Sequence, residues 1–223
     1  MKKIKQKPKA VLFDMDGVIV DSMPYHYLAW YEALRPLGIR VSVFEVYLRE
    51  GERWDKSLKD FLTQSGITPS SRTLAKIFRL RQRFFHRYFK RRLFEGVGEF
   101  LRCLKKNGYT LGLVTGTPRC ELNKILPSRI KGLFNTIVSG EMVKLGKPHP
   151  APYLKAAQLL GLKPRECLVV ENAPLGIRSA KAAGMFCAAI TTSLPKEYLK
   201  QADIIVDRLE EITGLIEKSC KIK

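Results

Sequence analysis

The chain has 223 residues, 45% of them hydrophobic, which suits one large domain or one domain with a smaller insert. Lysine and arginine outnumber aspartate and glutamate by 40 to 21, and the resulting net charge of +19 is compatible with nucleic acid, anionic lipid or small anionic partners. No apolar run approaches the roughly 18 residues of a membrane span. The basic start resembles a signal peptide, but its apolar stretch is cut short at Asp14, so we expect a cytoplasmic protein.

The cysteines and histidines exclude some kinds of site. Five cysteines are widely spaced without a CxxC pair, and three histidines are scattered along the chain. A disulfide framework and a zinc site are both disfavoured by this spacing, and reduced thiols are expected. A metal ion in this protein would therefore need oxygen ligands.

The first predicted strand, residues 11–13, reads VLF and runs directly into the segment DMDGVIVDS. Residues 20–90 then show helical periodicity, in SMPYHYLAWYEALRPLG and in DKSLKDFLTQSG, with almost no alternating run. We interpret residues 20–90 as a helical block that is inserted after the first strand, between two parts of a core formed by residues 1–19 and 91–223.

Residues 79–93, RLRQRFFHRYFKRRL, mix basic and aromatic side chains. A nucleic-acid surface has this composition, and so does an amphipathic helix whose aromatic rings face inward and whose arginines face water. No nucleic-acid motif accompanies the stretch, so the helix is the favoured interpretation and nucleic acid is not expected as a partner.

From about residue 95, short β-like runs alternate with helical stretches. Strands are predicted at 111–115, 137–139, 168–171, 186–191 and 204–206, with helices such as 151–160 and 175–183 between them. Together with residues 11–13, this alternation predicts an α/β fold: a Rossmann-like parallel sheet with helices on both faces.

Polar residues stand at the ends of these strands. In open parallel sheets the ligand site lies beyond the carboxyl ends of the strands, so Asp14 and Asp16 are expected to face a cleft. Two close carboxylates can hold a divalent cation between them, and Mg²⁺ is the cation that such hard oxygen ligands suit. Alternatively, one carboxylate acts as a nucleophile and the other as a general acid and base.

Three later strand ends and loops add to this set. Thr115, followed by Gly116, ends the run LGLVT and offers a hydroxyl to a phosphate oxygen. Lys147 lies in LGKPHPAPY, where two prolines stiffen the backbone around a positive charge. Glu171 and Asn172 close the run LVVEN and offer further oxygen ligands.

In combination and in this order, these motifs resemble the haloacid dehalogenase superfamily of phosphohydrolases. The resemblance spans residue 10 to about residue 190 and includes VVENAPLGIRSAKAAGM. It implies that the helical insert is a small cap domain, and DSMPYHYLAW is most similar to the sugar-phosphate phosphatase and β-phosphoglucomutase branch.

The resemblance also implies roles for the strand-end residues. Asp14 would attack phosphorus to form an aspartyl-phosphate, and Asp16 would act as the general acid and then the general base. Thr115, Gly116 and Lys147 would bind the transferring phosphoryl group. Mg²⁺ would be held by Asp14, the backbone carbonyl of Asp16, and the Glu171–Asn172 pair. Relatives usually have an aspartate at position 172, so the asparagine is expected to weaken Mg²⁺ binding.

Substrate contacts are expected from the cap. His26 matches the YHxxAW pattern of the family, as a hinge or a substrate hydrogen bond. The segment LREGERW falls where such caps carry a substrate-contacting loop, which makes Arg49, Glu50, Arg53 and Trp54 candidates.

The sequence thus predicts a Mg²⁺-dependent phosphatase that hydrolyses a small phosphate monoester, such as a sugar phosphate. The first alternative is a sugar phosphomutase of the β-phosphoglucomutase type, which returns the phosphoryl group to its sugar. A more distant alternative is a nucleic-acid-binding protein with a vestigial hydrolase core.

Overall fold

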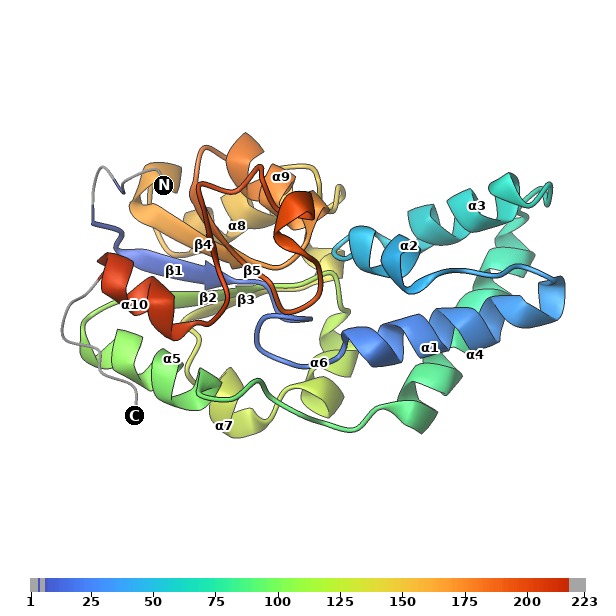
Figure 1. Ribbon diagram of the computed structural model, residues 1–223, viewed down its shortest axis with the longest axis horizontal. Coiled ribbons are helices and arrows are strands. Elements are labelled where there is room, and N and C mark those ends of the chain that lie inside the picture. The colour runs from blue at the N-terminus through green and yellow to red at the C-terminus, as the bar shows by residue number, and fades with distance from the viewer. Residues whose placement is uncertain (1–3, 5–6, 217–223) are drawn as a thin grey trace.

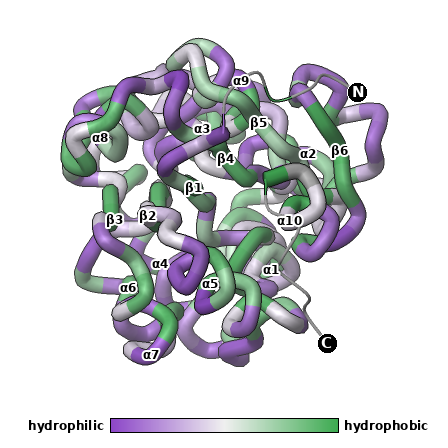
Figure 2. Tube along the Cα trace, turned by 90° about the vertical axis from the view of Figure 1, so that its left-hand side faces the viewer, coloured by the Kyte–Doolittle hydropathy of each residue, from purple (hydrophilic) through white to green (hydrophobic). Residues whose placement is uncertain are grey.

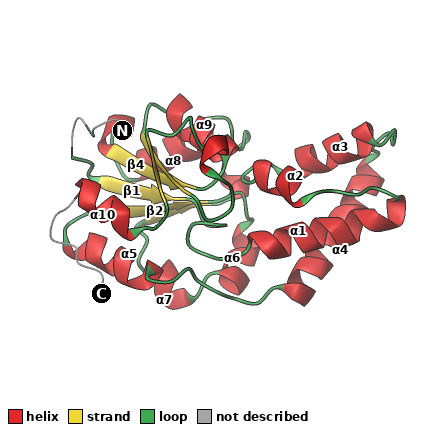
Figure 3. Cartoon of the chain, viewed as in Figure 1, coloured by secondary structure: helices red, strands yellow, loops and turns green. Residues whose placement is uncertain are grey.

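The computed structural model describes residue 4 and residues 7–216. Its centre is a six-stranded sheet with the order β3-β2-β1-β4-β5-β6, in which every neighbouring pair is parallel (Figure 3). The strands are β1 Ala10–Phe13, β2 Thr110–Val114, β3 Thr136–Val138, β4 Cys167–Glu171, β5 Phe186–Ile190 and β6 Ile204–Val206. The predicted Rossmann-like α/β fold is confirmed.

Helices cover both faces of the sheet (Figure 1). One face packs against α8 and α9, and the other against α5, α6, α7 and α10. These helices are α5 Val97–Lys106, α6 Arg119–Ile125, α7 Ser128–Lys131, α8 Ala151–Leu159, α9 Pro174–Ala182 and α10 Glu210–Ile216. The two predicted helices, 151–160 and 175–183, therefore lie within a residue of α8 and α9.

The strands are largely apolar because both sheet faces are covered. In β1, Val11 and Phe13 enter the core on one side, whereas Ala10 and Leu12 enter the core on the other. This alternation follows from the two-residue period of a strand, and it leaves no face on which a polar residue would meet water. Figure 2 shows β1, β3 and β6 as hydrophobic segments.

The helical block extends from the carboxyl end of the sheet (Figure 1). It contains α1 Met23–Leu34, α2 Val43–Leu48, α3 Trp54–Gln64 and α4 Ser71–Tyr88. These helices share a hydrophobic cluster of their own, built around Trp30, Leu58, Phe61 and Leu62. A separate cluster is what allows such an insert to keep its shape while it moves relative to the sheet.

Helix α2 is an element that the sequence pattern did not predict. It has only six residues, too few to show a helical period. Its signal is a capping box: the Ser42 hydroxyl accepts from the Glu45 backbone N–H at 3.1 Å, and the Glu45 carboxylate accepts from the Ser42 backbone N–H at 2.7 Å.

The basic, aromatic stretch is largely helical, as the favoured interpretation expected, but the helix ends at Tyr88 rather than continuing to residue 93. Phe85 is buried, and Arg79, Arg83 and Arg87 are exposed. Arg81 departs from this pattern because it is partly buried against His26. It lies four residues after buried Ile77 and four before Phe85, so helical geometry places it on the apolar face.

Two other expectations are tested by the described part of the chain. Cys120, Cys167 and Cys187 are free thiols, whereas Cys103 is disulfide-bonded, so the expectation of reduced thiols is wrong for Cys103. None of the described helices combines the length and the apolar character needed to cross a membrane. Most of the basic residues at the two ends of the sequence lie outside the described residues.

The packing predicts which core substitutions are costly. Phe100 of α5 is fully buried, and its ring meets that of Phe13 edge-on with centroids 5.9 Å apart. Phe100→Ala should lower the free energy of unfolding by about 3–5 kcal/mol, because it removes this contact and leaves a cavity. Urea denaturation measures the change. The control is Leu159→Ala on α8, where the side chain is 47% exposed and the expected change is about 0.5 kcal/mol or less.

Candidate active site

The parallel sheet brings the predicted polar residues together at one edge. Asp14 directly follows β1, Thr115 follows β2, and Glu171 is the last residue of β4. Lys147 comes from the loop that leads into α8. All four side chains are buried, so each charge needs a partner inside the protein.

Lys147 supplies the partner for two of these charges. Its Nζ lies 2.5 Å from Asp14 Oδ1 and 2.6 Å from Glu171 Oε1. The Tyr153 hydroxyl of α8 donates a second hydrogen bond to Glu171 Oε1 at 2.7 Å. The resulting cluster joins β1, β4, α8 and the loop before α8 through charge-assisted hydrogen bonds.

The surroundings raise the pKa values of both Asp14 and Lys147, but for different reasons. Burial, together with the nearby charges of Glu171 and Asp16, raises the pKa of Asp14 to about 8 although Lys147 acts against this. Burial alone would lower the pKa of the Lys147 amine, but the charges of Asp14 and Glu171 outweigh it and raise that pKa above its ordinary value. Lys147 is therefore a permanent positive charge beside Asp14.

Asp16 lies in a different hydrogen-bond network. Its Oδ1 accepts from the Ser22 hydroxyl at 2.6 Å and lies 3.0 Å from His26 Nε2. Its Oδ2 accepts from the hydroxyls of Thr117, at 3.3 Å, and Thr115, at 3.4 Å. Burial would raise the pKa of Asp16, but His26, Ser22 and Thr117 together hold it below its usual value. The two aspartates thus differ in their readiness to carry a proton, and Asp14 is the more readily protonated of the two.

Two glycines allow the residues at the end of β4, Glu171 and Asn172, to pack closely against neighbouring backbone. Glu171 Oε2 accepts from the backbone N–H groups of Asn172 and Ala173, at 2.9 and 3.3 Å. A Cβ on Gly176 would lie 1.7 Å from Glu171 Oε1, and a Cβ on Gly17 would lie 2.0 Å from Asn172 Nδ2. Gly17 also has a φ of +84°, which side chains rarely adopt. Only glycine fits at either position.

Two buried oxygens at this edge have no hydrogen-bond donor among the described residues: Asp14 Oδ2 and Asn172 Oδ1. Asn172 Oδ1 can only accept, and so can Asp14 Oδ2 when the carboxyl group is ionised, so a cation is the kind of group that would satisfy them. No cluster of three or more His, Cys, Asp or Glu side chains arranged for a metal occurs in the described part of the chain. The carboxylate oxygen of Asp14 and the amide oxygen of Asn172 are ligands of the kind that a hard cation takes.

Glu171 contributes to this set differently from Asp14. Both of its carboxylate oxygens already accept hydrogen bonds, from Lys147, Tyr153 and backbone N–H groups. Glu171 is therefore placed to hold the Lys147 side chain and the Asn172 backbone in position. Asn172 itself is held by a hydrogen bond from its Nδ2 to Ser193 Oγ at 2.9 Å, which leaves its oxygen available.

The loop between α2 and α3 lies directly over this edge. A Cβ on Gly51 would lie 2.5 Å from Lys147 Cδ, and the Gly51 carbonyl oxygen lies close to Gly116. Gly51, with φ of +79°, therefore lets the helical block touch the residues that follow β2 and the lysine. Trp54, at the start of α3, stacks on Phe78 of α4 with ring centroids 3.8 Å apart.

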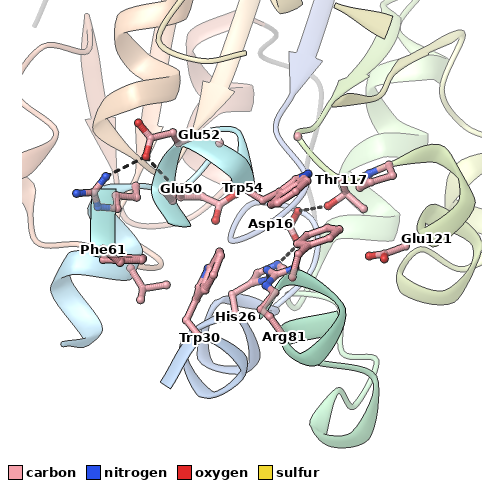
Figure 4. Close-up of a pocket in the computed structure, with 17 residues that line it drawn as sticks. Asp16, His26, Trp30, Glu50, Glu52, Trp54, Phe61, Arg81, Thr117 and Glu121 are labelled. Carbon is pink, nitrogen blue, oxygen red and sulfur yellow. Dashed lines mark hydrogen bonds and ion pairs between the residues drawn. The ribbon is translucent and has the colours of Figure 1, made fainter. Parts of the chain in front are cut away.

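A cavity lies between the helical block and the sheet edge (Figure 4). Its lining includes Asp16, His26, Arg49, Glu50 and Trp54. Arg49 makes ion pairs with Glu52, at 3.1 Å, and Asp60, at 2.8 Å. Four of the five candidate residues of the helical block thus line one cavity together with Asp16.

Arg53 points into a different recess. This second recess is lined by Thr115, Gly116, Lys147 and Arg53, among others, and lies on the other side of Gly51 and Trp54. The Arg53 guanidinium contacts Asp55 at 3.1 Å and the Lys144 carbonyl oxygen at 3.4 Å. It does not line the cavity that contains Asp16.

His26 links the helical block to the sheet. Its ring, on α1, contacts Asp16 through Nε2, stacks on Phe85, and receives Arg81 at 2.6 Å from Nδ1. Any movement of α1 would therefore change the surroundings of Asp16.

Sequence reasoning missed several members of this site. Arg81, Tyr153, Ser22 and Thr117 all contact a predicted site residue. Ser22 and Tyr153 lie within the quoted motifs DMDGVIVDS and LGKPHPAPY, and Arg81 could have been found from its spacing to Phe85. Thr117 lies two residues beyond the quoted run LGLVT.

Comparisons with known proteins agree with this geometry. Residues 8–184 match the family model described as haloacid dehalogenase-like hydrolase. The chain is 32% identical to hexitol phosphatase A of Escherichia coli (strain K12) over 209 residues, which cover 92% of this chain and 93% of the relative. It is 29% identical to β-phosphoglucomutase of Bacillus subtilis (strain 168) over 212 residues, 92% of each chain.

Solved structures show the same likeness. The crystal structure of β-phosphoglucomutase from Clostridium difficile superimposes with a TM-score of 0.83 at 25% sequence identity, covering 95% of this chain and 98% of the other. The family model covers well over half of the sequence, and it includes every strand end that contributes to the site. The chain therefore belongs to the haloacid dehalogenase-like hydrolases.

Proposed function

We propose that the protein is a Mg²⁺-dependent phosphatase that hydrolyses a small phosphate monoester, in particular a sugar phosphate, through an aspartyl-phosphate. The observation that carries this proposal is the surrounding of Asp14. One of its oxygens is paired with Lys147, while the other is buried without a donor among the described residues. Such an oxygen is available to a phosphorus atom or to a cation.

In the first step, an Asp14 oxygen attacks phosphorus, and the bond between phosphorus and the alcohol oxygen breaks. The leaving oxygen takes a proton from Asp16. In the second step, Asp16 accepts a proton from a water molecule, which attacks phosphorus and releases Asp14 and inorganic phosphate. The hydrogen bonds that lower the pKa of Asp16 favour its basic form in this second step.

Lys147 and Thr115 bind the phosphoryl group during transfer. The charge of Lys147 offsets the negative charge on the phosphoryl oxygens, and the Thr115 hydroxyl with Gly116 provides the opposite wall. Mg²⁺ would be held by Asp14, the backbone carbonyl of Asp16 and Asn172, and Glu171 would position these ligands. When bound, the ion supplies further neutralisation of the phosphate charge.

The helical block, residues 20–90, is proposed to be a mobile cap over this edge. It contacts the sheet edge through Gly51 and His26, and it has a hydrophobic cluster of its own. Movement of such a cap admits the substrate and then excludes water that does not take part in the reaction.

A phosphomutase is the second candidate, because a β-phosphoglucomutase is among the relatives. A mutase needs a cation in its cap to hold the distal phosphate of a bisphosphate. Trp54, directly after the cap loop, carries no charge and stacks on Phe78. Arg53 is paired in the second recess, and Arg49 is paired with two carboxylates. These contacts favour the phosphatase.

The nucleophile is tested by Asp14→Asn. Asparagine keeps the size of the side chain but removes the attacking charge, so turnover of phosphate esters should fall at least a thousandfold while the fold remains. Phosphate release and circular dichroism measure the two effects. The control is Asp21→Asn in the same loop, which should retain activity because Asp21 makes only a distant ion pair with Arg92 at 3.9 Å. One tenth of wild-type turnover in Asp14→Asn, without deamidation, would disprove covalent catalysis by Asp14.

The metal is tested by Asn172→Asp. A carboxylate at position 172 would add one negative charge to the oxygen set, so half-saturation by Mg²⁺ should occur at an at least threefold lower concentration. Titrations of activity and of thermal unfolding against Mg²⁺ measure the change. Asn123→Asp, a surface change near Lys131, is the control. An unchanged half-saturation point would place residue 172 outside the metal site.

Product analysis separates phosphatase from mutase. We expect inorganic phosphate as the main product from hexose monophosphates, because Arg49 and Arg53 of the cap loop are already paired with carboxylates. Incubation with β-glucose 1-phosphate and a trace of the 1,6-bisphosphate is the direct assay. Glucose 6-phosphate that accumulates well ahead of free phosphate would instead identify a mutase.

A further inference from the structure

Helix α4 of the cap carries a row of positive charges along one side. The helix runs beside α1 (Figure 1), and it buries Leu74, Ile77 and Phe85. The exposed cations recur on the opposite side, at intervals of three and four residues, and we call them the α4 row: Arg72, Lys76, Arg79, Arg83 and Arg87. At about 100° per residue, these positions fall within a sector of about 80° and span about 22 Å of helix.

No countercharge lies beside the α4 row. Residues 61–94 contain nine lysines and arginines but no aspartate or glutamate. Within the described part of the chain, none of the five side chains of the row makes an ion pair or a hydrogen bond. Like charges spaced four residues apart on a helix destabilise it. An external anion is therefore the kind of group that would relieve this repulsion.

Other helices of the protein pair their exposed cations internally. Arg102 of α5 meets Glu99 at 2.7 Å, and Arg35, directly after α1, meets Glu32 at 3.2 Å. In both cases the acid lies three residues earlier in the chain, where a helix places it on the same side. The α4 row has no such acids, although it has the spacing that would suit them.

The surroundings of the row distinguish between two polyanions, a nucleic acid and an anionic membrane. A helix that lies on a membrane inserts its apolar face into the lipid. The apolar face of α4 is packed inside the protein, and none of the exposed large hydrophobic side chains of the described residues belongs to α4. Four of the five cations are arginines, whose planar guanidinium groups match pairs of phosphate oxygens. These features favour a nucleic acid.

We propose that the outer face of α4 binds the phosphate backbone of a nucleic-acid duplex without reading its bases. A duplex carries about one charge per 1.7 Å of its length, so a straight row of about 22 Å meets phosphates along its whole extent. Backbone contacts give affinity without sequence preference, and they require no sequence motif. The absence of a motif therefore does not argue against this surface, although it made nucleic acid an unexpected partner at the level of sequence.

This surface is independent of the proposed phosphatase function. Phe78 and Arg81 of α4 line the active-site cavity, and helical geometry places both outside the sector of the α4 row. A duplex bound along the row therefore does not need to cover the cavity.

The test compares two variants that lose the same charge from different surfaces. Arg79→Gln/Arg83→Gln removes two cations from the middle of the row, and glutamine keeps a high helix propensity. Arg165→Gln/Arg178→Gln is the matched control, since it removes two exposed arginines of the core that also lack partners among the described residues. Fluorescence anisotropy with a labelled duplex of about 20 base pairs and random sequence measures Kd at several salt concentrations.

The wild type should bind with a Kd of about 1–100 μM at physiological salt. The α4 variant should bind at least tenfold more weakly, and its slope of log K against log salt should be shallower by about two. The control should keep its Kd within twofold of wild type and its slope unchanged. Thermal unfolding of the α4 variant should occur at no lower temperature than in the wild type, because two mutually repelling charges are removed. Arg79→Lys/Arg83→Lys, which keeps both charges, should keep the slope.

Three results would overturn the proposal. Equal losses of affinity in the α4 variant and the control would show that only the total charge matters. Absence of duplex binding by the wild type at about 100 μM protein would show that the row does not hold a duplex. Vesicles with about one third phosphatidylserine test the other polyanion. Vesicle binding that depends on Arg79 and Arg83, without duplex binding that does so, would assign the row to a membrane.

Discussion

The buried cluster of Lys147, Asp14 and Glu171 is the constraint on which the rest of the site depends. A charge removed from water is stable only when it is paired and its remaining hydrogen-bonding atoms are satisfied. Lys147 meets both carboxylates within 2.6 Å, and Tyr153 donates a further hydrogen bond to Glu171. One lysine therefore fixes the relative positions of two strand ends and of the loop before α8, and it leaves a single oxygen of Asp14 without a partner.

This cluster also explains how the cap can influence the chemistry. Gly51 of the cap loop touches the Lys147 side chain, and His26 of the cap touches Asp16. Opening the cap would thus expose Lys147 to water and remove a hydrogen bond from Asp16. Both changes weaken the electrostatic arrangement that transfers a phosphoryl group. In the proposed mechanism these contacts would tie catalytic competence to closure of the cap, because the two aspartates have these surroundings only when the cavity is covered.

Much of the core and of the site could be predicted because the signals are local. Asp14, Thr115 and Glu171 each follow an apolar run, and parallel strands necessarily bring their carboxyl ends to one edge. The rest depends on packing between distant segments. Arg81 belongs to a stretch whose arginines were expected to face water, and only the angle between α1 and α4 decides that it reaches His26. Tyr153 likewise reaches Glu171 because of where α8 lies on the sheet.

The cap loop shows that the directions of individual side chains were also beyond what the sequence could predict. The segment LREGERW was a correct place to look for cavity residues, since Arg49, Glu50 and Trp54 line the cavity. Its sequence could not say that Arg53 would turn into another recess or that Arg49 would be paired with two carboxylates. A side chain's direction changes by about 100° per residue at a helix start, and ion pairs depend on residues outside the segment.

The overall charge of the protein affects how often phosphate esters meet it, whereas the charges in the cavity affect which ester is bound. A net charge of +19 attracts phosphate esters of every kind and raises the rate at which they meet the protein. Such long-range attraction cannot tell one ester from another, because it acts on the phosphate that they share. Discrimination must arise where water is excluded, and there the groups that line the cavity with Asp16 include acids, aromatic rings, His26, Arg49 and Arg81. The basic exterior therefore raises the rate of encounter with phosphate esters in general, whereas the groups that line the cavity determine which ester fits.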